Sequence, residues 1–408
     1  INIMSTLTIA IISVFVLGYA LIAMEGLTKI NKAAIALLMF VFCWTLFMVD
    51  PAPFVQLMHP DFSGAGENVV AFANSLITEH LGDTATTLFF LMGAMTIVEI
   101  VDQNGGFNWV QNVMQSKTKR SLLWKIAFMT FFLSAILDNL TTSIVMIMIL
   151  RKLIHDKHDR MIYASLVIIA ANSGGAFSPI GDVTTIMLWN SGMITAGGVL
   201  SEIFIPSLVS MLIPAFLLSL SLKGNIQRDE LANDLSGDHE VLEFNGMQRK
   251  IIFAIGVGGL CFVPVFHFFT DLPPFVGILL VLGILWTITE VFYHNLHKRR
   301  GDNVHFSKRV STLLSRIDMS TILFFLGILM AVACLEEVGV LRELGSGLNI
   351  AFDGNHYAVT GIIGVLSSIV DNVPLVAGSM GMYPIQATGD MAVDGLFWQL
   401  LAYCAGVG

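Results

Sequence analysis

The sequence predicts an all-α polytopic membrane protein made of two inverted-topology repeats, each with a re-entrant hairpin and a broken transmembrane helix. Three observations lead to this fold class. The chain of 408 residues is 55% hydrophobic and only 12% charged, with a mean hydropathy of +0.78, which excludes an ordinary soluble domain. Polar residues interrupt its long apolar segments at a few places. The order of segments in the first half also recurs in the second half.

Most of the chain consists of stretches that are apolar and long enough to cross a bilayer. Two others, 121–154 and 357–385, carry an Asp-Asn pair near their middles, and we predict that each is a re-entrant hairpin. At 50–83, apolar residues at helical spacing predict an amphipathic helix that lies on the membrane surface. The predicted spans are 4–24, 33–49, 84–101, 161–189 (broken), 200–222, 251–269, 275–292 and 320–335, and a last one begins near 395.

The distribution of the 21 Lys and Arg residues predicts the side of the membrane on which each loop lies. When the segments are threaded in order, with each hairpin entering and leaving on one side, Arg342 is the one basic residue on one face. Lys125 falls inside the first hairpin, and all the others fall on the opposite face. By the positive-inside rule that face is cytoplasmic, and the main polar linkers lie on it.

Two motifs of the first half recur in the second half. The tetrapeptide Leu-Phe-Phe-Leu begins at Leu88 and again at Leu323, and the pair Asp-Asn begins at Asp138 and again at Asp371. The interval between the two motifs is therefore nearly the same in both halves. Because the threading opens the two predicted hairpins on opposite sides of the membrane, the repeats are predicted to be inverted.

This repeat divides the chain into a first repeat at 1–222, a cytoplasmic linker at 223–249 and a second repeat at 250–408. The second copy of the broken helix would open near Gly406, so we expect the natural chain to continue by roughly 45 to 50 residues beyond Gly408. Ile1 is not a plausible initiator, so residues are also expected before it.

The segment from Asn172 to Trp189 places Gly, Pro, Asn, Ser, Thr and Asp inside an apolar span. Broken backbone in hydrocarbon leaves N–H and C=O groups unpaired at several kcal/mol each, so it is tolerated only where it lines a cavity or an ion. Asp182 within it is an intramembrane ionisable group, which by default indicates a functional site. The alternative is a Gly/Pro kink whose Asp182 pairs with a neighbouring helix.

Carboxyl groups held in the membrane must be protonated or neutralised by a cation, and a hard monovalent cation prefers oxygen ligands. If one carboxylate binds either Na⁺ or H⁺, exchange needs no further device. Asp371 has an alternative role as a permanently ionised helix cap, because Pro374 follows it closely. Glu99 is a weaker candidate for a proton path. The candidate ion- and proton-binding residues are Asp138, Asn139, Thr141, Thr142, Asn172, Ser173, Asp182, Thr184, Thr185, Ser367, Ser368, Asp371 and Asn372, and those predicted to hold Na⁺ are Asp138, Asn139, Asn172, Asp182 and Thr184.

The motifs at 138–142 and 171–189 closely resemble the signature of the NhaD-type sodium/proton antiporters of the ion transporter superfamily. The resemblance implies extrusion of Na⁺ or Li⁺ in exchange for external H⁺ across a bacterial inner membrane. It also implies a homodimer in which the hairpins and broken helices move as in an elevator. We expect no enzymatic activity, no cofactor beyond the transported ions and no nucleic-acid partner.

Two other functions remain as alternatives. The same superfamily includes Na⁺-coupled dicarboxylate symporters, which are similar in carrying Ser-Asn-Thr at the hairpin tips. Here Asp stands in place of that Ser at both tips, and Pro374 stands where the first tip has Thr141, which disfavours recognition of a carboxylate substrate. The remote alternative is an intramembrane aspartyl hydrolase that uses Asp138 and Asp371.

Overall fold

The computed structural model describes residues 5–62, 66–114, 116–154, 156–222, 224–225, 244–300 and 310–408. These residues form helices and loops, with no β-strand beyond one isolated bridge between Thr118 and Asn225. Eight of the described helices are long and apolar enough to cross a membrane, which confirms the prediction of an all-α polytopic protein. They are α1 (Thr6–Ala23), α3 (Lys32–Val49), α5 (Glu67–Gln103), α7 (Lys119–Leu137), α12 (Phe204–Ser221), α13 (Gly246–Thr270), α14 (Pro274–Arg300) and α16 (Met319–Glu337).

Shorter helices complete the described part of the chain. Six of them contribute residues to a cavity that is described in the next subsection: α8 (Asn139–Leu153), α9 (Lys157–Ala176), α10 (Val183–Asn190), α18 (His356–Ser367), α19 (Asn372–Met382) and α20 (Leu396–Val407). The others are α2 (Glu25–Thr28), α4 (Ala52–Met58), α6 (Asn108–Val113), α11 (Ala196–Glu202), α15 (Val310–Leu313), the 3₁₀ helix η4 (Leu314–Arg316) and α17 (Val340–Ala351).

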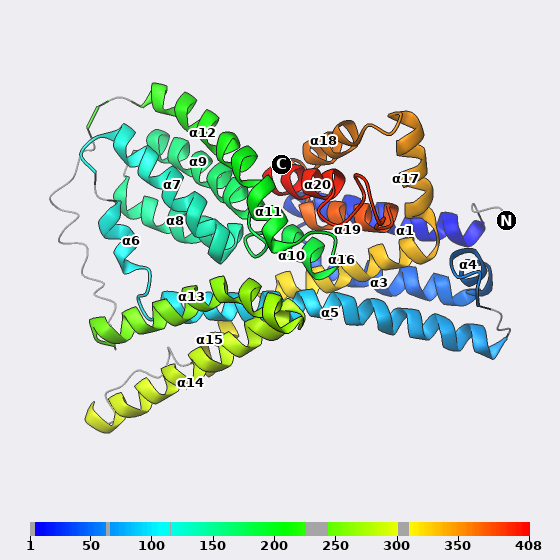
Figure 1. Cartoon of the computed structure of the whole chain (residues 1–408), viewed down its shortest axis with the longest axis horizontal. Helices are drawn as coiled ribbons and strands as arrows, with labels where there is room; N and C mark the ends of the chain where they lie inside the picture. The colour runs from blue at the N-terminus through cyan, green and yellow to red at the C-terminus, as the bar shows by residue number, and fades with distance from the viewer. Residues whose placement is uncertain are drawn as a thin grey trace.

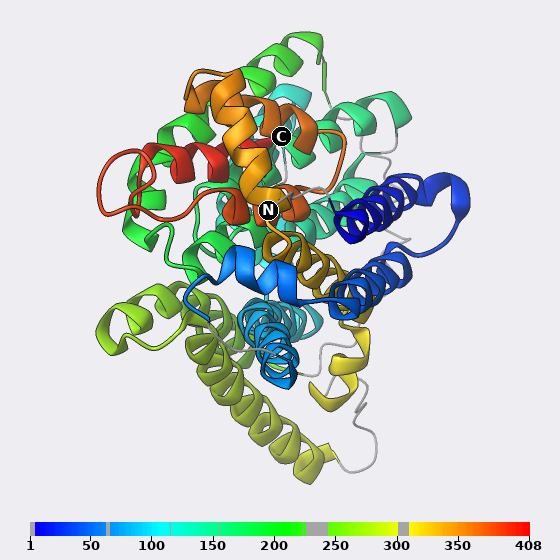
Figure 2. The ribbon, with the colours of Figure 1, turned by 90° about the vertical axis from the view of Figure 1, so that its right-hand side faces the viewer.

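The helices form two groups that meet at the middle of the molecule (Figure 1). One group contains α7, α8, α9 and α12, and the other contains α17, α18, α19 and α20. Helix α5 runs lengthwise beside both groups, α3 and α16 lie beside the second group, and α13 and α14 pack against α5 (Figure 1). Figure 2 shows α3, α5 and α16 nearly end-on, with α18 and α20 on one side of them and α14 on the other.

Helix α16 is the most deeply buried of the eight candidate spans, and its packing against α3 is unusually close. A Cβ atom added at Gly327 of α16 would lie 2.5 Å from the backbone carbon of Ala36 in α3. The indole nitrogen of Trp44 in α3 donates a hydrogen bond to the carbonyl oxygen of Met330 in α16 at 2.8 Å. Because the backbones of α3 and α16 approach this closely, no larger side chain fits at Gly327, and the two helices pack as one rigid unit.

The prediction of a surface helix at 50–83 is wrong for most of its length. Helix α5 runs without interruption from Glu67 to Gln103, so the polar segment continues directly into the span. Its apolar side packs on protein rather than on lipid headgroups, since Val69 and Leu76 form a buried cluster with Val55 of α4. The predicted linker at 223–249 lies mostly outside the described residues.

Candidate ion-binding site

Three helix breaks meet at the middle of the molecule, and each places an Asp carboxylate at the N-terminus of the helix that follows. Asp138 accepts the backbone N–H of Thr141 at 2.7 Å at the start of α8. Asp182 and Asp371 accept backbone N–H groups in the same way at the starts of α10 and α19. Asp is a preferred N-cap because its oxygens pair with free N–H groups and its charge faces the positive end of the helix dipole.

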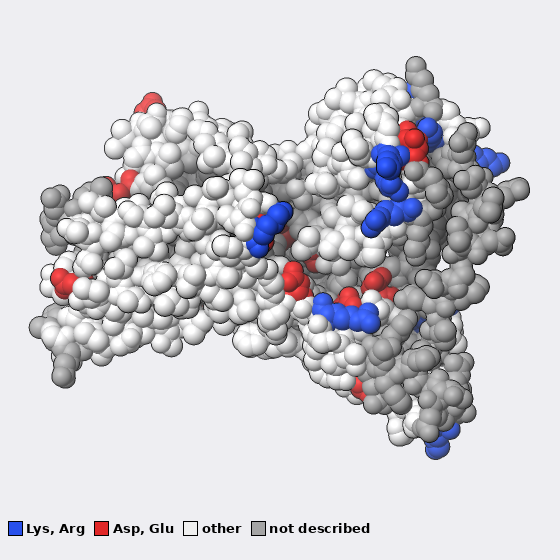
Figure 3. Space-filling model, turned by 180° about the vertical axis from the view of Figure 1, so that it is seen from behind, with Lys and Arg blue, Asp and Glu red and all other residues white. Residues whose placement is uncertain are grey.

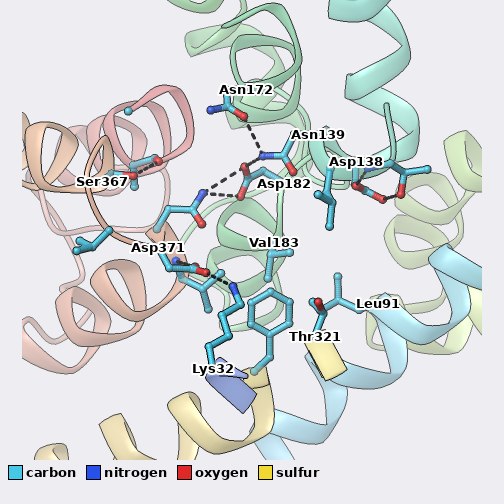
Figure 4. A pocket seen from close by; sticks show the side chains of 18 of the residues that line it. Lys32, Leu91, Asp138, Asn139, Asn172, Asp182, Val183, Thr321, Ser367 and Asp371 are labelled. Carbon is cyan, nitrogen blue, oxygen red and sulfur yellow. Dashed lines mark hydrogen bonds and ion pairs between the residues drawn. The ribbon is translucent and has the colours of Figure 1, made fainter. Parts of the chain in front are cut away.

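A cavity of about 340 Å³ lies between these breaks, with walls that come from both halves of the chain (Figure 4). Its volume is at the lower end of the range for small-molecule sites. The structure brings eight of the thirteen residues predicted for ion or proton binding to the wall of this cavity. They are Asp138, Asn139, Thr141, Asn172, Asp182, Ser367, Asp371 and Asn372.

Asp182 is the most deeply buried carboxylate of the cavity, with 1% of its surface exposed. It accepts a 2.6 Å hydrogen bond from the side-chain amide of Asn139 and a 2.7 Å bond from the hydroxyl of Thr184. The amide of Asn372, from the other half of the chain, approaches both of its oxygens at 3.4 Å. Among the described residues these donors are all neutral, so they solvate the carboxylate without balancing its charge.

The amide of Asn139 connects two of the breaks. Besides Asp182 it reaches the side-chain oxygen of Asn172 at 3.3 Å, and its backbone N–H donates to the carbonyl of Gly181 at 3.1 Å. Gly175 and Gly181 lie in direct backbone contact beneath it, where a Cβ on either residue would overlap the other. This contact closes the break between α9 and α10, and a Cβ at Gly174 or Gly181 would also overlap the backbone of Phe131 or Ser134 in α7, so glycines allow this break to touch α7.

Asp138 stands apart from this network. Figure 4 shows it on the opposite side of Val183 from Asp371, and its second oxygen accepts the hydroxyl of Thr141 at 2.7 Å. Its backbone has a φ of 93°, a region that non-glycine residues rarely adopt. A strained backbone at a membrane-embedded carboxylate is typical of functional positions, where the surrounding packing enforces the unfavourable angle.

Lys32 is not among the residues predicted for the ion site, yet its side chain lines the cavity. Its ammonium lies 3.0 Å from the carboxylate of Asp371 (Figure 4). It also lies 4.1 Å from the ring centre of Phe324. The distribution of basic residues predicts a cytoplasmic position for Lys32, because it adjoins Lys29 in a basic connection between two predicted spans. The one available signal was that Lys32 begins the apolar helix α3, so its long side chain could extend along the protein.

The Lys32 contact also changes the view of Asp371. Its carboxylate both caps α19 and pairs with an ammonium, so it is the least available of the three carboxylates to an incoming cation. This arrangement is the helix-cap alternative that the sequence left open for Asp371, with an added counter-charge from a distant helix. Ser367 lies four residues earlier and donates to the carbonyl of Ala405 at 2.7 Å.

The remaining predicted residues do not line the cavity. The hydroxyl of Thr184 donates a hydrogen bond to the carboxylate of Asp182 without itself lining the cavity. The hydroxyl of Thr185 donates to the backbone carbonyls of Ser178 and Asp182. Ser173 pairs with Ser210 of α12, Ser368 is exposed and donates to Val365, and Thr142 is buried with no hydroxyl partner among the described residues. Glu99 lies 4.0 Å from Arg316.

Comparison with known proteins identifies the family of the chain. The family model described as citrate transporter matches residues 19–408. Sodium/proton antiporter 1 and sodium/proton antiporter 2 of Arabidopsis thaliana are 41% and 38% identical over 98% and 97% of this chain. The Na⁺/H⁺ antiporter NhaD of Vibrio parahaemolyticus is 31% identical over 82% of it. The chain spans 64%, 87% and 81% of the lengths of these three relatives. The chain therefore belongs to the citrate transporter family and is a relative of the NhaD Na⁺/H⁺ antiporters.

Proposed function

We propose that this protein is a secondary active transporter that exchanges cytoplasmic Na⁺ or Li⁺ for external H⁺. The observation that carries the proposal is the environment of Asp182. This carboxylate is buried among neutral hydrogen-bond donors from both halves of the chain, so it requires either a bound cation or a proton. The names of the relatives, which are sodium/proton antiporters, support the same reading.

The charges of the cavity explain how one site serves both ions. Three carboxylates, Asp138, Asp182 and Asp371, line the cavity with one ammonium, that of Lys32. Lys32 compensates Asp371, which leaves Asp138 and Asp182 without a counter-charge among the described lining residues. Na⁺ bound at these carboxylates disfavours their protonation, and protonation removes the charge that holds Na⁺. Opposite fluxes of the two ions follow from this competition.

The dicarboxylate symporter is the other candidate within transport, and the description of the matching family as citrate transporter keeps it open to test. An acidic cavity disfavours it, because a carboxylate substrate would meet a net negative wall in which Lys32 is already paired. The aspartyl hydrolase is disfavoured too. Asp138 and Asp371 would have to act on one water, yet each has a separate partner, Thr141 and Lys32.

We also propose that the two halves are inverted repeats whose interrupted helix pairs, α7 with α8 and α18 with α19, are re-entrant hairpins. Equivalent contacts support the repeat. Ser134 donates to the carbonyl of Ala171, and Ser367, which occupies the same place before its Asp, donates to that of Ala405. Such repeats allow the site to open alternately to either side. The proposed division is a first repeat at 1–222, a linker at 223–249 and a second repeat at 250–408.

The proposed orientation has the basic end of the molecule in the cytoplasm. On the face shown in Figure 3, Lys and Arg gather at the middle and the right-hand part, whereas the described residues visible in the left-hand third include Asp and Glu but no basic side chain. By the positive-inside rule we assign the right-hand end to the cytoplasm. The bacterial inner membrane and the homodimer are proposed from the resemblance to NhaD-type antiporters.

The test is ion exchange by the purified chain in proteoliposomes that hold a pH gradient. Addition of NaCl or LiCl is expected to collapse the gradient, as reported by a pH-sensitive dye, and Asp182→Asn is expected to abolish this response. Asp156→Asn is the matched control. The exposed Asp156 caps α9, where the backbone N–H of Asp159 lowers the pKa of its carboxyl, so it is an N-cap outside the cavity.

A binding measurement separates loss of the site from loss of the fold. Na⁺ that binds the folded protein raises its thermal stability by RT ln(1 + [Na⁺]/Kd), which is about 2.7 kcal/mol at a hundredfold excess over Kd. The wild type and Asp156→Asn should show this stabilisation, and Asp182→Asn should melt normally without it. Exchange that persists in Asp182→Asn, or Na⁺-dependent uptake of labelled succinate or citrate without any proton movement, would refute the proposal.

A further inference from the structure

A second cavity lies behind the break that carries Asp371, on the side away from the ion site. It has a volume of about 450 Å³ and is enclosed by α1, α16, α17, α18 and α19. Its wall is apolar apart from the hydroxyls of Tyr19 and Ser379, and none of the described residues that line it is charged. The cavity therefore lacks the groups needed to hold an ion or a cluster of waters.

This cavity opens onto an apolar part of the surface that we expect to face the bilayer. Its rim includes Val16 of α1 and Ile362 and Leu366 of α18, whose side chains are 57%, 42% and 44% exposed on helices of apolar composition. Its floor includes Val359 and Ser379, of whose surface only 2% and 1% is exposed. The apolar lining is thus continuous from lipid-facing residues at the rim to enclosed residues at the floor.

One polar group in the wall lacks a partner. The hydroxyl of Tyr19 is buried and makes no hydrogen bond to any described residue. A buried hydroxyl without a partner is costly, so an occupant with an oxygen acceptor would be favoured over an occupant that is wholly hydrocarbon. An apolar tail with a carbonyl near its upper end fits both the lining and this hydroxyl.

We propose that this cavity is a phospholipid site that takes up one acyl chain, with the ester carbonyl beside the hydroxyl of Tyr19. The bilayer around the chain supplies this ligand at high local concentration, and each methylene moved into an apolar cavity keeps the environment that it has in the bilayer. Leu366 and Pro374, which flank the break at Asp371, form part of the wall. The bound acyl chain therefore packs against the back of the turn whose front faces the ion site. This inference does not depend on which ion is transported.

The cavity can be filled from within at Gly378 of α19. A Cβ atom added there meets no other atom within 4 Å, although Gly378 lines the cavity, so the open space lies directly above it. Gly378→Leu is therefore expected to occupy the cavity without displacing a neighbour. Gly361→Leu is the matched control, because Gly361 lies in α18, also has free space at its Cβ position, and does not line the cavity.

The experiment uses the full chain in nanodiscs that contain a phosphatidylcholine with a diazirine in one acyl chain, followed by peptide mapping after irradiation. Labelling of the floor residues Val359 and Ser379 is expected in the wild type and in Gly361→Leu, and its loss is expected in Gly378→Leu. Labelling of the exposed residues Ile213 and Leu217 of α12 should be equal in all three and reports an intact, embedded fold. Unlabelled floor residues in the wild type would overturn the proposal, whether the cavity is empty or holds part of a second copy. Floor labelling that survives Gly378→Leu would overturn it as well.

Discussion

Replacement of Lys32 by Gln should strengthen Na⁺ binding, because Lys32 supplies the one ammonium among the described residues that line the acidic cavity. Lys32 and Asp371 lie 3.0 Å apart with side chains that are 32% and 23% exposed. With Lys32 neutral, the carboxylate of Asp371 becomes a second source of attraction for a cation in the same cavity. The reverse change, Asp371→Asn, leaves the ammonium unpaired and should weaken Na⁺ binding.

The size of the effect follows from the partial burial of this pair. Two unit charges about 4 Å apart near a protein surface interact by roughly 4 kcal/mol before desolvation and screening. Fully exposed pairs retain about 0 to 1 kcal/mol, and disruption of a buried pair costs about 3 to 5 kcal/mol. For a pair that is one quarter to one third exposed, an intermediate value of about 1.4 kcal/mol corresponds to a tenfold change in affinity.

The assay is the Na⁺ concentration that gives half-maximal collapse of a pH gradient in proteoliposomes. It should fall about tenfold in Lys32→Gln and rise about tenfold in Asp371→Asn, since about 1.4 kcal/mol is tenfold. The double variant should return near to the wild type. Lys29→Gln is the control, because Lys29 belongs to the same connection but is exposed and does not line the cavity.

Two outcomes would refute this reasoning. The first is a half-maximal Na⁺ concentration in Lys32→Gln that equals those of the wild type and Lys29→Gln. The second is a shift in the same direction for Lys32→Gln and Asp371→Asn, which would indicate that the pair acts by holding the turn in place rather than by its charge. The melting temperatures of all variants, measured in parallel, identify any change that reflects damage to the fold.

Two further predictions concern stability, measured as the midpoint of thermal unfolding in detergent. Gly327→Ala should destabilise the protein by about 1 to 3 kcal/mol, because its Cβ would overlap the backbone of α3, whereas Gly283→Ala, with open space, should not. Glu337→Gln should lower the midpoint and reduce the free energy of unfolding by about 1 to 3 kcal/mol, since the carboxylate of Glu337 accepts bonds from the imidazoles of His59 and His80 at 2.8 Å each. This loss should be largest at acidic pH, where imidazoles are charged. Equal midpoints for the two glycine variants, or a Glu337→Gln effect independent of pH, would contradict these statements.

The sequence predicted the breaks and the carboxylates because both depend on local chemistry. A cluster of Gly, Pro and Asp inside an apolar span favours an interruption of the helix, which in a membrane is tolerated where the backbone is buried in protein or lines a cavity. Asp138, Asp182 and Asp371 each stand where a helix begins. The same argument could not separate Asp182, which only neutral groups contact, from Asp371, which Lys32 neutralises. That difference depends on a contact across 339 residues of chain.

The error at 50–83 has a similar origin. Apolar residues on one side of a helix indicate that this side is covered, but they do not identify the cover. Here Val69 and Leu76 are covered by α4, and His80 reaches Glu337 at the end of α16, so the apolar side of the segment packs on the protein. The position of Lys32 was missed for the complementary reason: charge counting assigns a residue to a loop and ignores the length of its side chain.

The hydrogen bond from the backbone of Asn139 to the carbonyl of Gly181 has a mechanical consequence. It fastens the turn between α7 and α8 to the interrupted stretch between α9 and α10, beside the contact of Gly175 with Gly181. Because sliding these two elements past one another would break that bond, we expect them to move together in any exchange movement. The contact between Lys32 and Asp371 joins α3 to the start of α19 through a long, flexible side chain, so we expect a displacement between these two elements to meet less resistance there.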